Sequence, residues 1–362
     1  MGNSRHIVMH TARPNPPKVD LMKLRRCYGN MDIPNLVNKL TDDFEGLRNE
    51  ASYALKESTN ISENVISALH SGALKGLYEC MSLSPDLVPR IISIYCNIAR
   101  VPTGRRNLIE FENFNQLLKD TTNSEIPDIA IKSYELIQIL VLDRSVVPYF
   151  VEHFEFCENG LTYPMDENVI VQTLDIMARM CVSEEGISSV IGTLSRCQEL
   201  FSRQKFLVPV CNTLYGVSQT LAGKKAIHSL NILPALLDHI RAFEGNTHEV
   251  GHILKLLMSM TVYQLTKIDV FKHIDVVKLV EVAGSILTYN HNLCTTCLLR
   301  FIACLCDHKA YRSSFEPLLP QLALMSYCGD TQIKESTIEV IQLIVREPGV
   351  PFNLEDVRQK YL

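Results

Sequence analysis

The stretch NTHEVGHILKLL, residues 246–257, contains three side chains whose types and spacing could do chemistry. His248, Glu249 and His252 stand in the order His-Glu-x-x-His. On a helix, residues four apart lie on one face, so the two imidazoles could bind zinc while the carboxylate acts as a general base. The spacing therefore raises the hypothesis of a zinc peptidase.

The residues around this motif do not complete a zinc site. In the longer form His-Glu-x-x-His-x-x-Gly-x-x-His, Lys255 stands where Gly is required and Met258 where the last His is required. Two histidines alone leave a tetrahedral zinc short of its third protein ligand. We therefore predict no catalytic residue, no metal and no cofactor. A metallopeptidase that uses His248, Glu249 and His252 is kept as the last alternative.

The cysteines offer a second candidate for metal or redox chemistry. There are twelve, and Cys294, Cys297, Cys304 and Cys306 fall in one apolar run, CTTCLLRFIACLCDH. Metal knuckles place their ligand pairs on separate turns, whereas this run has the pattern of one helix. We interpret the cysteines as reduced thiols that serve as small apolar side chains.

Composition limits the classes of function. The chain has 362 residues, of which 46% are hydrophobic and 21% charged, and its formal net charge is -5. Such a composition is typical of a folded protein, and the net charge argues against a general nucleic-acid binder. No signal sequence or apolar run of about 18 residues is present, so we expect a soluble cytoplasmic protein without a membrane partner.

An internal repeat predicts the elements that must position these residues. Apolar helical segments recur along the chain, each followed by a polar turn and a short amphipathic segment. Their last apolar residues lie 37 to 45 residues apart, a period typical of stacked helical repeats. These anchors are Leu55, Ile98, Ile139, Met180, Val217, Met260, Leu305 and Ile344.

The repeat resembles the armadillo repeat, with the HEAT repeat as the nearest alternative. SGALKGL and NILPALL resemble the start of the second armadillo helix, and GRRNLIE and GKKAIHS resemble the turn and first helix. The resemblance implies an all-α fold, a right-handed α-solenoid of about eight armadillo or HEAT-like repeats. We expect an extended, Pro-containing arm at residues 1–24, the repeat array at 25–347 and a tail or cap at 348–362.

In armadillo proteins the third helix of each repeat lines a concave groove, and nuclear-import carriers grip a basic peptide there with a ladder of Trp and Asn. This chain has no Trp, and the corresponding positions carry both signs of charge. The resemblance implies a mixed polar groove for a protein segment, with a merely solvated face as the alternative. The candidate groove residues are Ser93, Asn97, Tyr134, Gln138, Asp175, Arg179, Asn212, Lys255 and Arg300.

A narrower resemblance concerns the two ends of the array. RRCYGNMDIPNLVNKL and STIEVIQLIVREP resemble the radial spoke armadillo proteins of motile cilia, of the spoke head 14 type. This resemblance implies a non-catalytic structural scaffold in the axoneme of a cilium or flagellum. Its partners would be radial spoke or other axonemal subunits within a large complex. The alternative is a soluble armadillo adaptor or cargo carrier.

Overall fold

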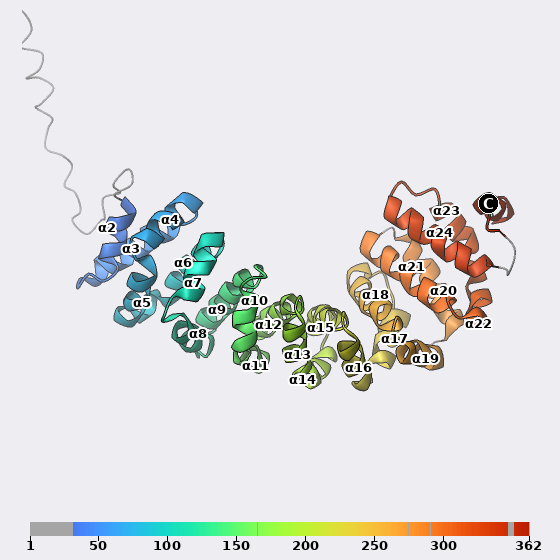
Figure 1. Cartoon of the computed structure of the whole chain (residues 1–362), viewed down its shortest axis with the longest axis horizontal. Helices are drawn as coiled ribbons and strands as arrows, with labels where there is room; N and C mark the ends of the chain where they lie inside the picture. Colours follow the sequence, from blue (N-terminus) through green and yellow to red (C-terminus); the bar gives the residue numbers. More distant parts are fainter. Residues whose placement is uncertain (1–31, 165, 274, 290, 347–350, 362) are drawn as a thin grey trace, which may run out of the picture. The chain divides into compact units, whose positions relative to one another are not determined.

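The computed structural model describes residues 32–164, 166–273, 275–289, 291–346 and 351–361. Within these ranges every regular element is a helix and none is a strand, which confirms the predicted all-α solenoid. The predicted arm at residues 1–24 lies outside the described residues. The chain divides into two compact units between Val146 and Val147. Figure 1 labels the helices of both units.

Unit 1 contains the helices that end before Val147. They are α2 (Asp32–Lys39), α3 (Glu45–Ser58), α4 (Ser62–His70), α5 (Ala73–Leu83), the 3-10 turn η1 (Pro85–Leu87), α6 (Val88–Ala99), α7 (Pro102–Glu110), α8 (Phe114–Thr122) and α9 (Pro127–Leu140).

Unit 2 contains the remaining helices. They are α10 (Val147–Glu152), α11 (Glu155–Leu161), α12 (Glu167–Met180), α13 (Glu184–Ile191), α14 (Leu194–Phe201), α15 (Gln204–Val217), α16 (Leu221–Ser229), α17 (Leu233–Arg241), α18 (Thr247–Thr261), α19 (Gln264–His273), α20 (Val276–Thr288), α21 (Asn292–Cys306), α22 (Lys309–Arg312), η2 (Ser313–Leu318), α23 (Leu319–Met325), α24 (Thr331–Val345) and α25 (Leu354–Tyr361).

The helices form a repeating pattern of two short elements followed by a longer third helix. In unit 1 the third helices α3, α6 and α9 pack in succession, and in unit 2 the third helices α12, α15, α18, α21 and α24 do the same. The hydrophobic core lies between the packed third helices. In α21, for example, Phe301 and Ile302 are fully buried. Because each fully buried apolar side chain contributes about 1.5–3 kcal/mol, the contacts between third helices dominate the stability of each unit.

The structure corrects the register of two predicted anchors. The helices α3, α9, α12 and α15 each contain 14 residues, so their last residues Ser58, Leu140, Met180 and Val217 are equivalent. Leu55 therefore lies three residues before its repeat position and Ile139 one residue before it. Both errors arise because apolar residues were used to mark the helix ends. In α3 three further helical residues follow Leu55, and in α9 the apolar sequence LVL runs past the end of the helix, so it does not mark that end.

Three glycines allow the chain to turn sharply after a third helix. Gly104, Gly186 and Gly223 follow the ends of α6, α12 and α15 by five or six residues, and a Cβ there would lie 2.0, 2.1 and 1.9 Å from a backbone oxygen of that helix. Only glycine fits so close an approach. The turn is completed by capping, since the Gly223 N–H donates to the Thr220 hydroxyl at 3.1 Å.

The described part of the predicted tail contains a helix that packs on the array. In α25, Val357 is buried, and the Arg358 Nε donates to the Ser326 Oγ at 2.9 Å. The Arg358 guanidinium also lies 3.9 Å from the ring centroid of Tyr327. These contacts fasten α25 to the last repeat.

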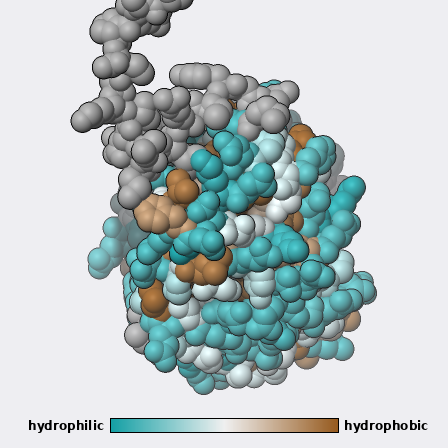
Figure 2. All heavy atoms as spheres, turned by 90° about the vertical axis from the view of Figure 1, so that its left-hand side faces the viewer, coloured by the Kyte–Doolittle hydropathy of each residue, from teal (hydrophilic) through white to brown (hydrophobic). Residues whose placement is uncertain are grey.

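The helices of the described residues can be compared with the length and apolar character of a membrane-spanning segment. No helix among the described residues combines the length and apolar character needed to cross a bilayer. Figure 2 shows one face of the molecule, which is mostly hydrophilic with hydrophobic side chains in small groups.

Candidate protein-binding surface

The His-Glu-x-x-His residues lie in the first turns of α18, and two of them are bonded to neighbouring residues. The Nδ1 of His252 is 2.8 Å from the Oδ1 of Asn212 on α15. Glu249 accepts hydrogen bonds from the Nε2 of Gln204 at 2.7 Å and from the Nδ2 of Asn246 at 3.0 Å. The imidazole of His252 thus contacts the preceding repeat, and the carboxylate of Glu249 contacts both the preceding repeat and the residue before α18.

The electrostatics of this motif favour a neutral imidazole. Burial lowers the pKa of His252 below its usual value, and the nearby His248, Lys255 and His291 lower it further. The rings of His248 and His252 have centroids 4.9 Å apart. Among the described residues no group of three or more metal-ligating side chains comes together. The absence of a metal stays a prediction, and the motif offers two imidazoles without a third ligand.

The cysteines behave as small apolar side chains in the described part of the chain. Of the eleven cysteines there, all are free and nine are buried. Burial raises the pKa of the Cys211 thiol to about 12 and that of Cys294 to about 12. Thiols with such high pKa values are poor nucleophiles and poor metal ligands at neutral pH.

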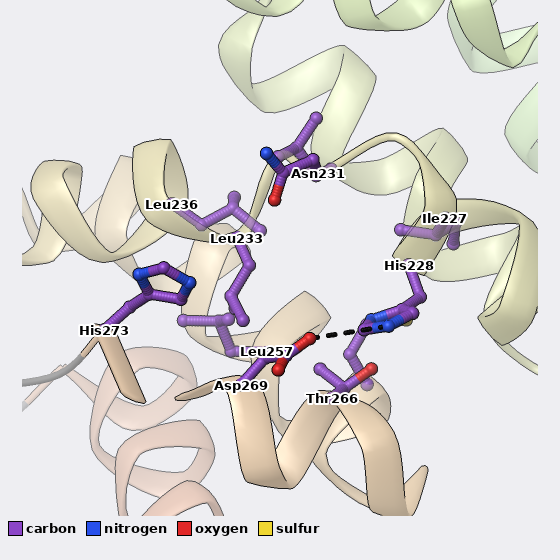
Figure 3. Close-up of a pocket in the computed structure, with 11 residues that line it drawn as sticks. Ile227, His228, Asn231, Leu233, Leu236, Leu257, Thr266, Asp269 and His273 are labelled. Carbon is purple, nitrogen blue, oxygen red and sulfur yellow. Dashed lines mark ion pairs between the residues drawn. The ribbon is translucent and has the colours of Figure 1, made fainter. Parts of the chain in front are cut away.

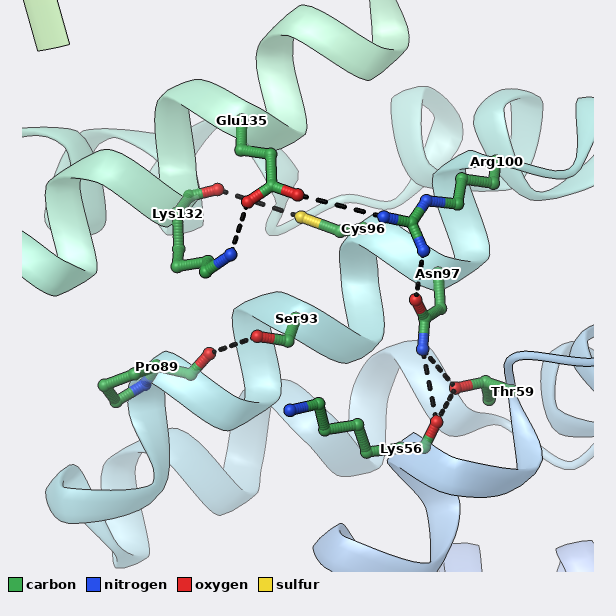
Figure 4. Close-up of polar contacts among 9 residues, drawn as sticks. All are labelled: Lys56, Thr59, Pro89, Ser93, Cys96, Asn97, Arg100, Lys132 and Glu135. Carbon is green, nitrogen blue, oxygen red and sulfur yellow. Dashed lines mark hydrogen bonds and ion pairs between the residues drawn. The ribbon is translucent and has the colours of Figure 1, made fainter. Parts of the chain in front are cut away.

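The predicted groove residue Asn97 links two helices and is only 7% exposed. Its Nδ2 donates to the backbone oxygen of Lys56 at 3.2 Å and to the Thr59 hydroxyl at 3.2 Å. Its Oδ1 accepts from the Arg100 Nη1 at 3.0 Å. Figure 4 shows these contacts joining α3 and α6. The structure therefore corrects the expectation that Asn97 faces a ligand.

The same position is used in the same way in three other repeats. A residue in the last turn of a third helix meets a residue at the end of the preceding third helix, and we call these contacts the inter-repeat seam. The Ser218 Oγ donates to the Ser259 Oγ at 2.7 Å, Cys304 is hydrogen-bonded to Thr261, and a Cβ on Gly216 would lie 2.7 Å from the Cys181 Cβ. The seam pairs are Thr59–Asn97, Cys181–Gly216, Ser218–Ser259 and Thr261–Cys304.

The structure also corrects the prediction for Tyr134, which is 1% exposed and belongs to the core. With Leu140 as the end of α9, the corresponding groove position is occupied by Glu135. The Glu135 carboxylate pairs with Lys132 at 2.5 Å and with Arg100 at 3.8 Å (Figure 4). The predicted residue Gln138 is half-buried on the same helix.

Two other polar residues on the third helices of unit 1 have contacts within the fold. The Arg90 Nη1 donates to the Asn49 Oδ1 at 2.5 Å, and the Arg90 guanidinium lies 5.8 Å from the ring centroid of Tyr53. The predicted residue Ser93 donates to the backbone oxygen of Pro89 at 2.9 Å.

The predicted groove residues of unit 2 have more varied environments. Asp175 and Arg179 pair with each other at 2.7 Å. The Lys255 Nζ lies 4.0 Å from the ring centroid of Tyr215. Arg300 is exposed, and it makes no ion pair with any residue that the structure describes.

A hollow of about 510 Å³ opens across the third helices of unit 2. We call it the third-helix hollow. Its volume is within the range of clefts that bind ligands in proteins. It is lined by Tyr215, Gln219, Lys224, Met258, Ser259, Val262, Arg300, Ala303, Cys304 and Glu339.

Two predicted groove residues are associated with this hollow. Arg300 lines it directly, and Lys255 contacts it through Tyr215. Sequence reasoning did not nominate Tyr215, Met258 or Lys224. Tyr215 and Met258 both stand in the last turn of their third helices, so inspecting the last turn of each helix would have found them. Lys224 lies in the short helix α16 after a turn, and the repeat pattern of the third helices does not predict its position.

Burial and hydrogen bonding position the ammonium group of Lys224 at the edge of the hollow. Its Nζ donates to the backbone oxygen of Ser218. Desolvation lowers the pKa of Lys224 from its usual value. The hollow therefore presents the positive charge of Arg300 beside an ammonium group that is partly removed from water.

A second, much smaller cavity of about 30 Å³ lies between α16, α17, α18 and α19 (Figure 3). The His228 Nε2 and the Asp269 Oδ2 are 3.5 Å apart there, and the Thr266 hydroxyl is buried without a partner among the described residues. A hydrogen bond from Lys272 lowers the pKa of Asp269. A cavity of this size is comparable to the volume of a water molecule in the liquid.

The comparisons with known proteins bear on the fold. No family model matches the chain, and no curated protein matches it. Among solved structures, an engineered protein is similar with a TM-score of 0.73 and 12% identity, over 86% of this chain and 78% of that one.

Two designed armadillo repeat proteins are also similar to this chain. The protein YIII(Dq)4CqI has a TM-score of 0.55 and 15% identity over 63% of this chain and 99% of its own. The protein YIII(Dq.V1)4CPAF, solved in complex with the peptide (KR)4, has a TM-score of 0.57 and 16% identity over 63% of this chain and 99% of its own. The chain therefore has an armadillo-like repeat fold.

Proposed function

We propose that the chain is a non-catalytic scaffold that binds segments of other proteins along its third helices. The observation that carries this proposal is the third-helix hollow, which is open, mixed in polarity and built from four successive repeats. A designed protein of similar fold was solved with a peptide. The proposed contact residues are Asp175, Arg179, Asn212, Lys255 and Arg300, with Ser93 in unit 1.

The proposal extends to a location and a set of partners. We infer a role in the axoneme of a cilium or flagellum, in a radial spoke, with other axonemal subunits as partners. The support is the resemblance at the two ends of the array. Of these segments, STIEVIQLIVREP falls mainly on α24, whereas CYG lies outside the described residues. The repeat array at 25–347 and the cap at 348–362, which includes α25, belong to the same proposal.

Lysine-directed cross-linking of the native complex, followed by mass spectrometry, tests the scaffold. We expect links from Lys224 and Lys255 to another protein, because both ammonium groups lie at the hollow. Lys278 on α20, which contributes nothing to the hollow, is the reference position. Links that reach partners from Lys278 but never from Lys224 or Lys255 would overturn the proposed surface.

Fractionation of motile cilia tests the location. We expect the chain to stay with the axoneme after membranes are removed with detergent, together with spoke subunits. Recovery only in the soluble fraction with a peptide-bearing cargo would overturn the spoke role and favour the soluble carrier, whose support is the peptide complex of the designed protein.

A further inference from the structure

The third-helix hollow carries more positive than negative charge. Lys224 and Arg300 line it, and Lys255 lies beside it over the ring of Tyr215. Glu339 on α24 is the one acidic residue among the lining residues. The local balance is thus opposite in sign to the net charge of the whole chain, which is -5.

These cations have no carboxylate partners in the described part of the molecule. The Lys224 Nζ donates to a backbone oxygen, Lys255 rests on an aromatic ring, and Arg300 is exposed. The nearby Asp307 is paired with Lys267 at 3.0 Å. In unit 1, by contrast, Arg100 and Lys132 share the carboxylate of Glu135. The hollow therefore holds charge that the fold itself does not neutralise.

We propose that the hollow binds an extended acidic segment of a partner protein. A carboxylate of that segment would take the fork of Arg300, whose five donors match a carboxylate in two parallel bonds. A second carboxylate would lie between Lys224 and Lys255. The exposed side chain of Val262, beside Met258, offers contact area to an apolar residue of the same segment.

A peptide fits these observations better than a nucleic acid does. Binding to a phosphate backbone needs a continuous row of cations along the strand. Here two cations line the hollow, a third lies over the ring of one lining residue, and the acidic Glu339 is also in the lining. The inference rests on the proposed scaffold function and adds the chemistry of the partner.

The test measures binding of fluorescein-labelled peptides to the full chain by anisotropy. The probes are (Asp-Glu)4, (Lys-Arg)4 and (Gly-Ser)4, with an oligodeoxythymidine of the same length as a further arm. We expect (Asp-Glu)4 to bind about tenfold tighter than the other probes, and its affinity to fall as salt rises. Equal affinity for the acidic and basic peptides would overturn the inference, and so would tighter binding of the oligonucleotide.

Charge variants locate the site. Arg300→Glu and Lys255→Glu should each weaken (Asp-Glu)4 binding about tenfold, whereas Lys278→Glu on α20 should leave it unchanged. Glu339→Gln removes a repelling carboxylate and should tighten binding, a gain that misfolding cannot produce. The inference fails if Lys278→Glu is as damaging as Arg300→Glu or if Glu339→Gln weakens binding.

The outcome can be separated from that of the scaffold proposal. A native partner cross-linked at Lys255 through a basic or neutral segment would overturn the acidic partner and leave the scaffold intact. Links to partners only from positions outside the third helices would overturn both.

Discussion

Several polar side chains on the third helices are bonded to neighbouring repeats. Asn97 bonds to the end of α3, Asn212 to His252 and Ser259 to Ser218. Each contact satisfies a group that would otherwise lose its hydrogen bonds to water when the helices pack. A polar residue on this face is therefore a candidate for binding only after its contacts within the fold are known.

The environment of His252 predicts a pH-dependent stability of unit 2. Its pKa in the folded state lies below the usual value of 6.5. As pH falls below 6.5, the unfolded chain binds a proton before the folded chain does, so stability is full above this pH and is lost as pH falls through the lowered pKa. The melting temperature of the native chain should fall more between about pH 7 and about pH 5 than that of His252→Gln, which keeps a donor for Asn212. Parallel pH profiles for the two proteins would contradict this.

The same motif predicts no stoichiometric zinc. The two imidazoles have no third ligand among the described residues, and a catalytic zinc site takes about three protein ligands. Purified untagged protein should contain well under one zinc ion per chain by mass spectrometry, and His252→Ala should contain no less. One zinc per chain that disappears in His252→Ala would revive the metallopeptidase.

Arg48 is predicted to be the most sensitive charged residue of unit 1. It is 8% exposed, and its guanidinium donates to the Ser84 Oγ at 2.7 Å and to the backbone oxygens of Asp42 at 2.7 Å and Leu83 at 3.3 Å. Arg48→Met leaves these acceptors unsatisfied and should cost about 2–3 kcal/mol in urea unfolding. Arg106→Met, at an exposed position, should change stability by less than about 0.5 kcal/mol. A similar loss in both variants would mean that the bonds of Arg48 are not the cause.

At the scale of the element, the turns after α6, α12 and α15 depend on a close backbone approach. Gly104, Gly186 and Gly223 meet backbone oxygens that leave no space for a side chain. The end of one third helix thereby sets where the next short helix begins.

Gly223→Ala should destabilise unit 2 by about 1–3 kcal/mol, because its Cβ would overlap the Val217 oxygen and backbone must move. Gly192→Ala is the matched control, since its Cβ would lie 3.4 Å from the Ser189 oxygen. The control should shift stability by less than about 0.5 kcal/mol. Equal urea midpoints for the two variants would contradict the steric argument.

The period of the sequence was enough to predict the third helices but not every register within them. Six of the eight anchors fall on their repeat positions, whereas Leu55 and Ile139 do not. A shift of one residue turns a helix by about 100°, so the error at Ile139 placed buried Tyr134 in the groove instead of Glu135. The hollow itself was beyond prediction, because Tyr215, Met258 and Arg300 meet only when three helices pack side by side.

At the scale of the whole molecule, each repeat contacts mainly its neighbours. The third helices of each unit pack in sequence order, and stability in such arrays is approximately a sum over repeats and the interfaces between them. Damage at one position should therefore weaken nearby repeats and spare distant ones.

Hydrogen exchange in Arg48→Met tests this locality. Amides of α3 and α6 should exchange faster than in the native chain, while those of α21 and α24 in unit 2 should keep their protection. Uniform acceleration across both units would show that the chain unfolds as one cooperative body. In Gly223→Ala, measured in parallel, amides of unit 2 should exchange faster, while those of α3 and α6 should keep their protection.

The inter-repeat seam also limits how such a chain can evolve. Its pairs differ from repeat to repeat, with Asn meeting Thr, Gly meeting Cys, Ser meeting Ser and Cys meeting Thr. A copy of α18 in the place of α15 would bring a serine against Cys181, where even a Cβ lies 2.7 Å away. The seam residue of each third helix fits the residue that it meets on the preceding third helix. Duplicating or deleting one repeat therefore requires matching changes on two helices at once.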